Sequence, residues 1–487
     1  MMGLAKQRKI LVSNAQPNRS ADEITPPPPG GANKYGGRGR IIMLSAMLLI
    51  LAVLRIFWTR TAFIVIAPPP PGNMTAANQR TQMPSLDVDV APSAWDGVKI
   101  PFYMYPTILS DWEKHCPRGD GVQDKAVEPQ WIDQLRNSPW RVHRPRKALL
   151  FVIPLYLNGI SYGKCKDVKQ LGRRTVNTLK ASKYFRRHGG LDHAFMSTYF
   201  RNSKLLRHLL PALYKLLRKV IVIDRLDNTH WSQLDRRRCM VNVMHNGGEL
   251  TADTLSIPKS PKCRLFFAGK VDKREMYRWR RAVFNAPSLG ANSMLYATPC
   301  KENTVRRCDA NRTNACCSDE RKSKAHFLEE MRACKWSIFI RGDDAGSSRF
   351  PRSIGALVPS VVVSPGVEHY LSFQCIVPWN NIAVFTDADA LLQNATQEID
   401  AALSSFDQDE SKRLELVRNL KRWAPHVVWS HPRSTAAGNA LVDTVRRCFT
   451  AKRMGPTFDL SRVPDIPCPL IPEGDKFQAF YSQHVTR

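Results

Sequence analysis

Short, uninterrupted apolar runs recur along the chain from Ile100 onward, with helical patterns between them. Such runs predict strands that are buried on both faces, because a half-exposed strand alternates apolar and polar side chains. We expect strands within residues 148–157 (ALLFVIPLYL), 220–224 (VIVID), 264–268 (RLFFA), 336–340 (WSIFI), 360–364 (SVVVS) and 382–385 (IAVF). Helices between buried strands are typical of parallel sheets covered on both faces, so the pattern predicts an α/β fold.

Helical periodicity is clearest in two stretches. Residues 168–187 form a basic amphipathic pattern, and residues 407–429 carry Leu414, Val417 and Leu420 on one helical face. At 487 residues the chain exceeds what one hydrophobic core usually supports, so we expect two α/β domains that meet near residues 255–265. The predicted division is an N-terminal Rossmann-like domain (98–258), a C-terminal Rossmann-like domain (259–430) and a C-terminal extension (431–487).

Residues 41–58 (IIMLSAMLLILAVLRIFW) form an apolar run interrupted only by Arg55. Its 18 residues would extend about 27 Å as a helix, which is most of a bilayer core, and Arg55 lies near the end, where its charge can reach the interface. We therefore predict a transmembrane signal anchor over residues 41–60. A cleaved signal peptide is the competing interpretation, but its charged region would then be 40 residues long.

The charges ahead of this run predict its orientation. Seven Lys and Arg residues are opposed there only by Asp22 and Glu23, so residues 1–40 should be a cytosolic tail. The rest of the chain is then lumenal, beginning with a Pro-rich stem over residues 61–97. Glycosylation sequons lie on that side at Asn73, Asn311 and Asn394.

The formal net charge of +30 narrows the choice of partners. The excess is spread through the main body without a zinc-finger spacing, basic leucine zipper or RNA-recognition signature, so nucleic acid is not an expected partner. Anionic sugar nucleotides, acidic glycans and membrane surfaces fit such a charge. The 12 cysteines favour an oxidising compartment, and the spacing of Cys300, Cys308, Cys316 and Cys317 is more typical of disulfides than of a zinc site.

Residues 341–359 (RGDDAGSSRFPRSIGALVP) carry the strongest candidate chemistry. A predicted strand ends at Ile340, and a loop with arginines and paired serines leads from it into a predicted helix. Loops at the carboxyl ends of parallel strands bind phosphate groups, because helix N-terminal amides and nearby arginines favour negative charge. A diphosphate is the expected ligand, and an ordinary surface loop is the alternative.

Four blocks of sequence occur in order along residues 148–430. They are 151–156 (FVIPLY), 184–193 (YFRRHGGLDH), 264–270 (RLFFAGK) with the basic and apolar residues through Phe284, and 334–364, which holds Arg-Gly, Ser-x-Arg, a helix, a Pro and a strand. Together these blocks resemble the exostosin family, glycosyltransferase family 47.

The resemblance implies a GT-B fold, in which two Rossmann-like domains face a cleft, here preceded by one N-terminal transmembrane helix. It also implies a type II Golgi membrane enzyme that transfers a hexosyl or pentosyl group, with inversion, from a nucleoside-diphosphate sugar to a glycan or glycoprotein. The acceptor would bind chiefly to the N-terminal domain. One helix would hold the protein in the membrane, and homo- or hetero-oligomers are left open.

Such a transfer needs positive groups for the leaving diphosphate and a base for the acceptor hydroxyl. The residues predicted to bind the donor are Lys270, Arg341, Gly342, Ser347, Ser348 and Arg349. Asp192 or His193 is the predicted catalytic base, because a Gly-Gly turn can present them at a cleft. The alternative is a carboxylate that fixes this turn beside a packed histidine.

No metal cofactor is expected. GT-B enzymes generally use side chains and helix dipoles for the leaving group, so Asp387-Ala388-Asp389 and Asp87-Val88-Asp89 are not assigned to a metal despite their Asp-x-Asp pattern.

The chain departs from the family pattern beside the Ser-x-Arg element. Arg352 stands where the family usually has Asp or Glu, Pro351 precedes it, and Pro365 stands where an Asp commonly follows the strand. These departures keep an alternative open: a catalytically inactive exostosin-like protein that binds glycan or pairs with an active partner.

Overall fold

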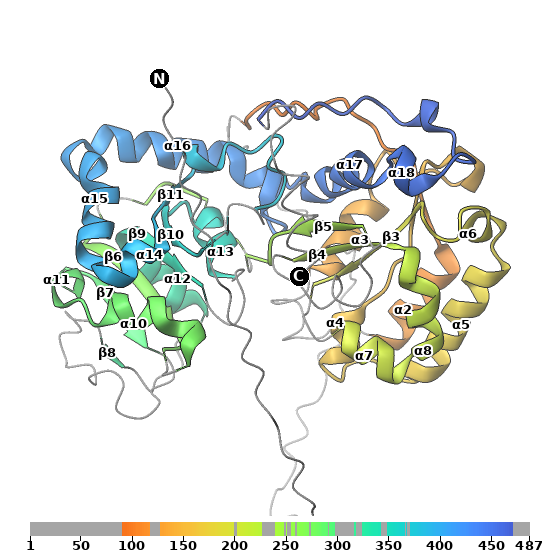
Figure 1. Ribbon diagram of the computed structural model, residues 1–487, viewed down its shortest axis with the longest axis horizontal. Helices are drawn as coiled ribbons and strands as arrows, with labels where there is room; N and C mark the ends of the chain where they lie inside the picture. The colour runs from red at the N-terminus through yellow and green to blue at the C-terminus, as the bar shows by residue number, and fades with distance from the viewer. Residues whose placement is uncertain are drawn as a thin grey trace, which may run out of the picture. The chain divides into compact units, whose positions relative to one another are not determined.

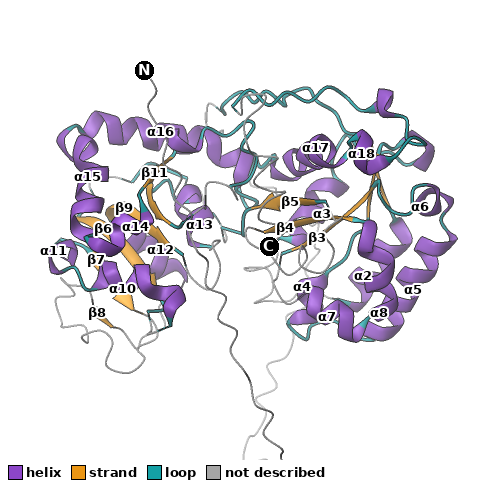
Figure 2. Cartoon of the chain, in the orientation of Figure 1, coloured by secondary structure: helices purple, strands orange, loops and turns teal. Residues whose placement is uncertain are grey.

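Two parallel β-sheets, each with helices packed around it, make up the described part of the chain (Figures 1 and 2). The structure is a computed structural model, and it describes residues 90–116, 127–198, 202–225, 239–247, 250, 255–258, 261–271, 274–290, 292–297, 316–317, 324–341, 348–365, 367 and 371–470. These residues belong to one compact unit, Gln82–Arg487. The α/β class predicted from the apolar runs is confirmed.

Several predicted features lie outside the described residues. They are the cytosolic tail and transmembrane anchor (residues 1–60), most of the stem, and the sequons at Asn73 and Asn311. Across the described ranges, no helix combines the length and the apolar character needed to span a bilayer.

The end of the predicted stem is described and is packed against the fold. Ala91 and Trp95 are buried, and the Trp95 indole Nε1 donates a hydrogen bond to Pro467 O at 2.9 Å. Burial of a large aromatic side chain removes much apolar area from water, which explains why this part of a Pro-rich segment joins the globular unit.

The first sheet contains five strands in the order in which they occur along the chain. The strands are β1 (Phe102–Met104), β2 (Leu150–Val152), β3 (His193–Ser197), β4 (Ile221–Arg225) and β5 (Met240–Val243). Each neighbouring pair is parallel, with Phe151 opposite His193 and Ser197 opposite Asp224. The carboxyl ends of all five strands therefore form one edge of the sheet.

The second sheet has the strand order β11-β10-β9-β6-β7-β8, and its pairs are also parallel. The strands are β6 (Cys263–Gly269), β7 (Met294–Ala297), β8 (Cys316–Cys317), β9 (Cys334–Ile340), β10 (Ser360–Val363) and β11 (Ala383–Phe385). β6 and β9 are neighbours, with Leu265 opposite Trp336. The loops that follow these two strands therefore start side by side.

The helices that surround the sheets are α2 (Pro106–His115), α3 (Glu128–Arg136), α4 (Leu157–Ser161), α5 (Val168–Ala181), α6 (Lys183–Arg187), α7 (Asn202–Leu209), α8 (Pro211–Leu216), α10 (Arg278–Phe284), α11 (Pro287–Gly290), α12 (Lys324–Arg332), α13 (Arg349–Gly355), α14 (Ala388–Gln393), α15 (Ala395–Gln408), α16 (Glu410–Val427), α17 (Ala436–Cys448) and α18 (Ala451–Met454). Short 3₁₀ turns lie at Pro145–Lys147, Leu217–Lys219, Glu275–Tyr277, Trp379–Asn381 and Leu460–Arg462. Figure 1 shows α17 on one side of the first sheet and α2, α5 and α8 on the other.

Each of the six apolar runs contains a strand. They correspond to β2, β4, β6, β9, β10 and β11, although residues 148–157 are extended only at Leu150–Val152. The chain leaves the strand at Pro154, which has no N–H for a ladder hydrogen bond. β1, β3, β5, β7 and β8 were not predicted. β3, for example, begins with His193 and ends with Ser197, so it contains only three consecutive apolar residues.

The two predicted helical stretches are present with altered bounds. Residues 168–187 divide into α5 and α6 at Ser182, whose Oγ accepts a hydrogen bond from Phe185 N at 3.4 Å and so caps α6. Residues 407–429 contain α16, whose buried face includes Leu416, Val417 and Leu420.

The segment after α16 connects the helices of the second sheet to those of the first. α16 contacts α13 and α15, whereas α17 contacts α3, β4 and β5. Between them, the Trp429 indole Nε1 donates to Met244 O at 3.0 Å, and Gln134 Nε2 donates to Trp429 O at 2.9 Å. The predicted C-terminal extension therefore packs, through α17, against the first sheet.

Disulfides reinforce this architecture among the described cysteines. Cys263–Cys334 joins the starts of β6 and β9, Cys239–Cys448 joins the segment before β5 to the end of α17, and the other two pairs are Cys116–Cys165 and Cys375–Cys468. Disulfides are typical of proteins that fold in an oxidising compartment, as the cysteine content predicted. Cys300 and Cys308 lie outside the described residues.

Candidate functional site

Cations gather at the carboxyl ends of β6 and β9. Lys270 directly follows β6 and Arg341 directly follows β9, and the parallel register of these strands places the two residues opposite each other. Both are half-buried. Two residues that the sequence predicted for donor binding, from segments about 70 residues apart, therefore lie at one sheet edge.

Arg280, on α10, holds these two loop starts together. Its guanidinium donates to Lys270 O at 2.6 Å, to Arg341 O at 2.9 Å and to Ile340 O at 3.2 Å. The side chain is 4% exposed and its Cζ lies 4.7 Å from the centroid of the Tyr277 ring. A planar group with five donors suits this role, because it can bond several carbonyls that diverge at the end of a sheet.

Arg349, the first residue of α13, lies beside this group. Its Cζ is 5.0 Å from the centroid of the Phe267 ring, and its guanidinium lies so close to Gly269 that a Cβ there would overlap it. Removal from water, together with the positive charges of Arg280 and Arg352, lowers the pKa of Arg349 to about 9. Arg349 is still protonated at pH 7, but burial and the neighbouring cations make its charge less favourable than it would be in water.

Arg352 makes contacts that the acidic residue usual at this position in the family could not make. Its Nε donates to Gly247 O at 3.3 Å, and its Cζ lies 5.3 Å from the centroid of the Phe327 ring. Burial lowers the pKa of Arg352 as well. The side chain therefore connects α13 to the segment that follows β5 of the first sheet.

The remaining predicted donor-binding residues are only partly described. Ser348 is the N-cap residue of α13, but its side chain makes no capping hydrogen bond. Gly342 and Ser347 lie outside the described residues. The structure thus brings together Lys270, which follows β6, with Arg341 and Arg349 from the predicted loop. Arg280 belongs to the same cluster, and the sequence did not predict it.

Asp192 and His193 belong to a second network, in which both of them are fully buried. His193 Nδ1 lies 2.8 Å from Asp192 Oδ1, and Arg187 Nη2 donates to Asp192 Oδ2 at 2.8 Å. The Tyr105 hydroxyl lies 2.8 Å from His193 Nε2, and the histidine ring stacks on Phe151 with centroids 4.7 Å apart. These distances fit a neutral histidine that donates from Nδ1 and accepts at Nε2.

The pKa shifts agree with this arrangement. Burial raises the pKa of Asp192, but the hydrogen bonds and charges of His193 and Arg187 outweigh it, so the net shift is downward. Burial lowers the pKa of His193. Asp192 is then an anion and His193 is neutral at pH 7.

The position of this pair bears on its predicted role. His193 is the first residue of β3, so the pair lies at the amino edge of the first sheet, opposite the carboxyl edge. Both residues are 0% exposed. The geometry favours the alternative stated above, a carboxylate that fixes the Gly-Gly turn beside a packed histidine, and the role as catalytic base stays a prediction.

A buried polar network at the carboxyl edge of the first sheet was not predicted. Glu128, at the start of α3, is 1% exposed and accepts hydrogen bonds from Asn158 N at 3.2 Å and Thr198 N at 3.5 Å. Burial is the main cause that raises the pKa of Glu128 well above 4.5, and the charge of Asp224 adds to it. A single Glu in an amphipathic helix gives no sequence signal for such a position.

Asp387 and Asn394 both cap helices, and glycosylation of Asn394 stays a prediction. Asp387 Oδ1 accepts from Asp389 N at 2.8 Å and Ala390 N at 3.1 Å, which caps α14. Asn394 is exposed, and its Oδ1 accepts from Gln397 N at 3.1 Å at the start of α15. Among the described residues, no cluster of His, Cys, Asp or Glu has the arrangement of a metal site.

A family model for the exostosin GT47 domain matches residues 96–399, which is more than half of the chain and includes both sheets. The cation cluster thus lies within a glycosyltransferase domain. The chain belongs to the exostosin family, glycosyltransferase family 47.

Similarity to solved structures is low. Sucrose-phosphate synthase from Thermosynechococcus elongatus is 12% identical, with a TM-score of 0.31 over 65% of this chain and 83% of that one. The N-terminal domain of Candida albicans trehalose-6-phosphate phosphatase is 9% identical, with a TM-score of 0.30 over 61% of this chain and 79% of that one. No curated protein sequence matches the chain significantly.

Asp192→Asn should destabilise the fold without affecting the binding of nucleoside diphosphate. The change removes a buried anion that accepts from Arg187 and His193, so the free energy of unfolding should fall by about 2–3 kcal/mol in urea titrations. Asp465→Asn, at an exposed position, is the control and should change little. Loss of activity with unchanged stability would instead identify Asp192 as part of the catalytic machinery.

Glu128→Gln should change how stability depends on pH. The folded-state pKa of Glu128 is raised above its unfolded value of 4.5. Its contribution to stability is therefore fully present below about pH 4.5 and is lost as the pH rises through the folded pKa. The difference in free energy of unfolding, variant minus wild type, should be constant below that pH and then rise by up to about 1.4 kcal/mol per pH unit. A difference that does not vary between pH 4 and pH 8 would contradict the raised pKa.

Proposed function

We propose that this member of the exostosin family is a Golgi glycosyltransferase of GT-B type. It transfers a hexosyl or pentosyl group from a nucleoside-diphosphate sugar to a glycan or glycoprotein, with inversion. The family match and two parallel sheets support the enzyme class and the fold type. The apolar run at residues 41–58 and the disulfides support a lumenal protein held by one membrane span, with exposed Asn394 as a glycosylation site.

The observation that carries the proposal is the cation cluster at the carboxyl edge of the second sheet. Arg280 fixes Lys270 and Arg341 side by side, and the charge of Arg349 is destabilised by its cationic neighbours. A nucleoside diphosphate brings at least two negative charges, which would relieve this repulsion and accept charge-assisted hydrogen bonds. In transfer, the same cations would stabilise the charge that develops on the leaving diphosphate, so the proposed reaction needs no metal cofactor.

The acceptor is assigned to the first sheet, where Glu128 is the best placed carboxylate for a general base. It lies at the carboxyl edge, and burial raises its pKa well above 4.5, which makes its carboxylate a stronger base than an exposed one. Asp192 and His193 remain the base predicted from the sequence, but they lie at the opposite edge.

The alternative function is an inactive exostosin-like protein that binds glycan or an active partner. Arg352 favours it, because the family usually has Asp or Glu at this position. The contact of Arg352 with Gly247 O provides another reason for an arginine at this position.

Arg349→Ala should weaken nucleoside-diphosphate binding about 100-fold and leave the unliganded fold as stable as the wild type, or more stable. The affinity falls because charge-assisted hydrogen bonds are lost, whereas the stability does not, because the lowered pKa of Arg349 means that its charge is unfavourable in the empty site. Thermal unfolding of the full-length protein with UDP and with GDP measures both effects, since a ligand at 100 times its Kd should add about 2.7 kcal/mol to the stability of the wild type.

Arg173→Ala, which removes an exposed cation from α5, is the matched control and should bind as the wild type does. Unaltered affinity in Arg349→Ala would contradict the assignment of the cluster. If no nucleoside diphosphate stabilises the wild type, the transferase proposal fails and the inactive alternative is favoured.

If Glu128 is the base, Glu128→Gln should lower kcat by about 100- to 10,000-fold and leave the affinity for nucleoside diphosphate unchanged. The amide keeps the size of the side chain but cannot accept the proton. In the wild type, kcat should fall as Glu128 is protonated at low pH, and the variant should lose this limb of the pH profile. A variant that keeps wild-type kcat would assign Glu128 a structural role only.

A further inference from the structure

Helices α5, α7 and α8, which cover one side of the first sheet, carry a large excess of positive charge (Figure 1). Residues 157–220 contain 15 Lys and Arg but only two acidic residues, Asp167 and Asp192. Asp192 is buried and bonded to Arg187 of α6, and Asp167 lies 3.6 Å from His115 Nδ1. Neither acid forms an ion pair with a cation of these three helices.

The three helices pack side by side, so their cations share one surface. α8 contacts both α5 and α7. Gly172 of α5 lies so close to Leu210, at the start of α8, that an added Cβ would be 2.5 Å from Leu210 Cδ2. We call the exposed cations of this layer the basic face; they are Lys169, Arg173, Lys180, Lys204, Arg207, Lys215, Arg218 and Lys219. None of them has an ion-pair partner among the residues that the structure describes.

The basic face also exposes an apolar side chain. Leu209, at the end of α7, is 42% exposed and lies two residues after Arg207. One exposed leucine is ordinary on a protein surface. Among several cations it has a specific meaning, because surfaces that lie on membranes combine Lys and Arg, which attract phosphate groups, with apolar side chains that enter the headgroup region. A soluble polyanion would leave Leu209 in water, so the combination fits an anionic bilayer better.

The predicted anchor would keep such a bilayer within reach. Residues 61–89 separate the predicted span from the first described residues. A segment of this length spans about 30 Å as a flexible coil and about 90 Å when extended. A tethered body meets the headgroups at a high effective concentration, so weak electrostatic contacts are sufficient for docking.

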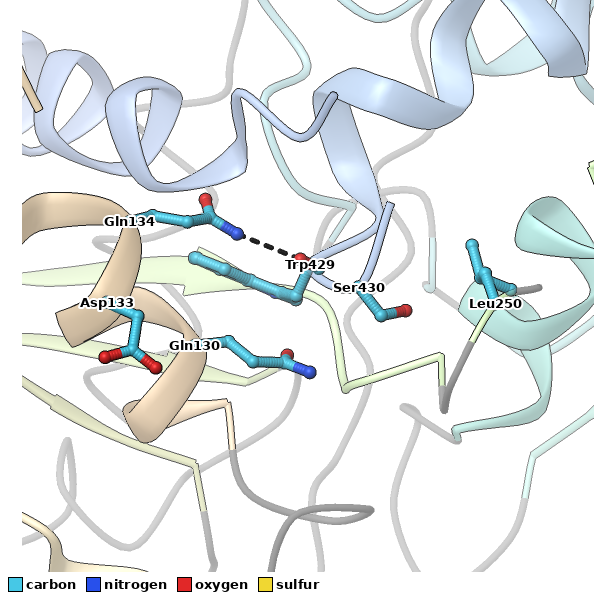
Figure 3. Close-up of a pocket in the computed structure, with 6 residues that line it drawn as sticks. All are labelled: Gln130, Asp133, Gln134, Leu250, Trp429 and Ser430. Carbon is cyan, nitrogen blue, oxygen red and sulfur yellow. Dashed lines mark hydrogen bonds between the residues drawn. The ribbon is translucent and has the colours of Figure 1, made fainter. Parts of the chain in front are cut away.

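The basic face is separate from the sites described above. The cation cluster lies at the carboxyl edge of the second sheet. Figure 3 shows a hollow of about 300 Å³ between α3 and the segment after α16, and none of its described lining residues comes from α5, α7 or α8. A partner on the basic face therefore needs no residue of the candidate site.

We propose that the basic face docks on a bilayer that contains anionic phospholipids. Its Lys and Arg side chains lie at the phosphate groups, and Leu209 enters the headgroup region. This inference goes beyond the transferase proposal and does not depend on it.

The test places a bimane fluorophore on the full-length protein in phospholipid vesicles that carry spin-labelled headgroups. The label is attached through Ala212→Cys, exposed on α8, or through Ala401→Cys, exposed on α15 as the control; no described cysteine is free to react. With about 30% phosphatidylserine, quenching at position 212 should be about tenfold stronger than with phosphatidylcholine alone, and quenching at position 401 should not change. About 0.5 M NaCl should remove the difference, because salt screens the attraction.

The combined variant Arg173→Gln, Lys215→Gln and Arg218→Gln should weaken docking about 100-fold and abolish the extra quenching. The matched control is Lys412→Gln, Arg418→Gln and Arg422→Gln, which removes the same charges from exposed positions on α16 and should dock as the wild type does. Leu209→Ser should weaken docking about tenfold, because it removes the apolar contact and no charge.

Equal quenching at position 212 in both kinds of vesicle, or quenching that persists in the combined variant, would overturn the inference. If dextran sulfate binds the basic face and anionic vesicles do not quench the label, the partner is an acidic glycan and the membrane proposal fails. Binding of UDP and GDP should be unchanged in the combined variant, so this failure is distinguishable from failure of the transferase proposal.

Discussion

The hydrogen bonds from Arg280 to three backbone carbonyls are the constraint on which the candidate site depends. Two parallel strands end at the same edge, and their last carbonyls have no further ladder partners. The buried guanidinium of Arg280 donates hydrogen bonds to the carbonyls of Lys270, Ile340 and Arg341. The loops that start there are thereby held with their own cationic side chains close to one another, an arrangement that mutual repulsion would otherwise oppose.

The positive charge held in this way explains the other features of the second sheet's edge. Gly269 lets the Arg349 guanidinium approach the backbone, and the rings of Phe267 and Tyr277 offer negative faces to Arg349 and Arg280. Cation–π contacts compensate only part of the repulsion, since the pKa of Arg349 remains lowered to about 9. The described cations are therefore held in place by the protein itself, and a bound anion would further stabilise the charge of Arg349.

The sequence was sufficient to predict which residues follow the strands of the second sheet. It was not sufficient to predict which side chains lie next to them in space. Lys270 and Arg341 could be predicted because each follows an apolar run that is long enough to be recognised as a strand. That β6 and β9 are adjacent depends on the strand order, which no local pattern encodes. Arg280 and Glu128 could not be predicted for the same reason, because their roles depend on carbonyl or amide groups from segments distant in sequence.

His193 illustrates a position for which the sequence pattern left two interpretations open. A titratable pair after two glycines resembles an exposed turn, but β3 begins at His193 itself, so the side chain enters the core and stacks on Phe151. The glycines are needed because both take positive φ, at 57° for Gly189 and 85° for Gly190, and the second packs against Phe185. With a polar residue at each end, β3 contains only three consecutive apolar residues, which are too few to predict a strand from the sequence.

α13 connects the cation cluster of the second sheet to the segment that follows β5 of the first sheet. The seven-residue helix carries Arg349 at its start and packs against Leu250 at its end, and Arg352 between them bonds Gly247 O from the segment after β5. Arg349 and Arg352 thus lie on one short helix, the first beside the Phe267 ring of the second sheet and the second bonded to the segment after β5. Because a carboxylate cannot donate a hydrogen bond to a carbonyl, an arginine at position 352 makes a contact between α13 and that segment which the acidic residue usual in the family could not make.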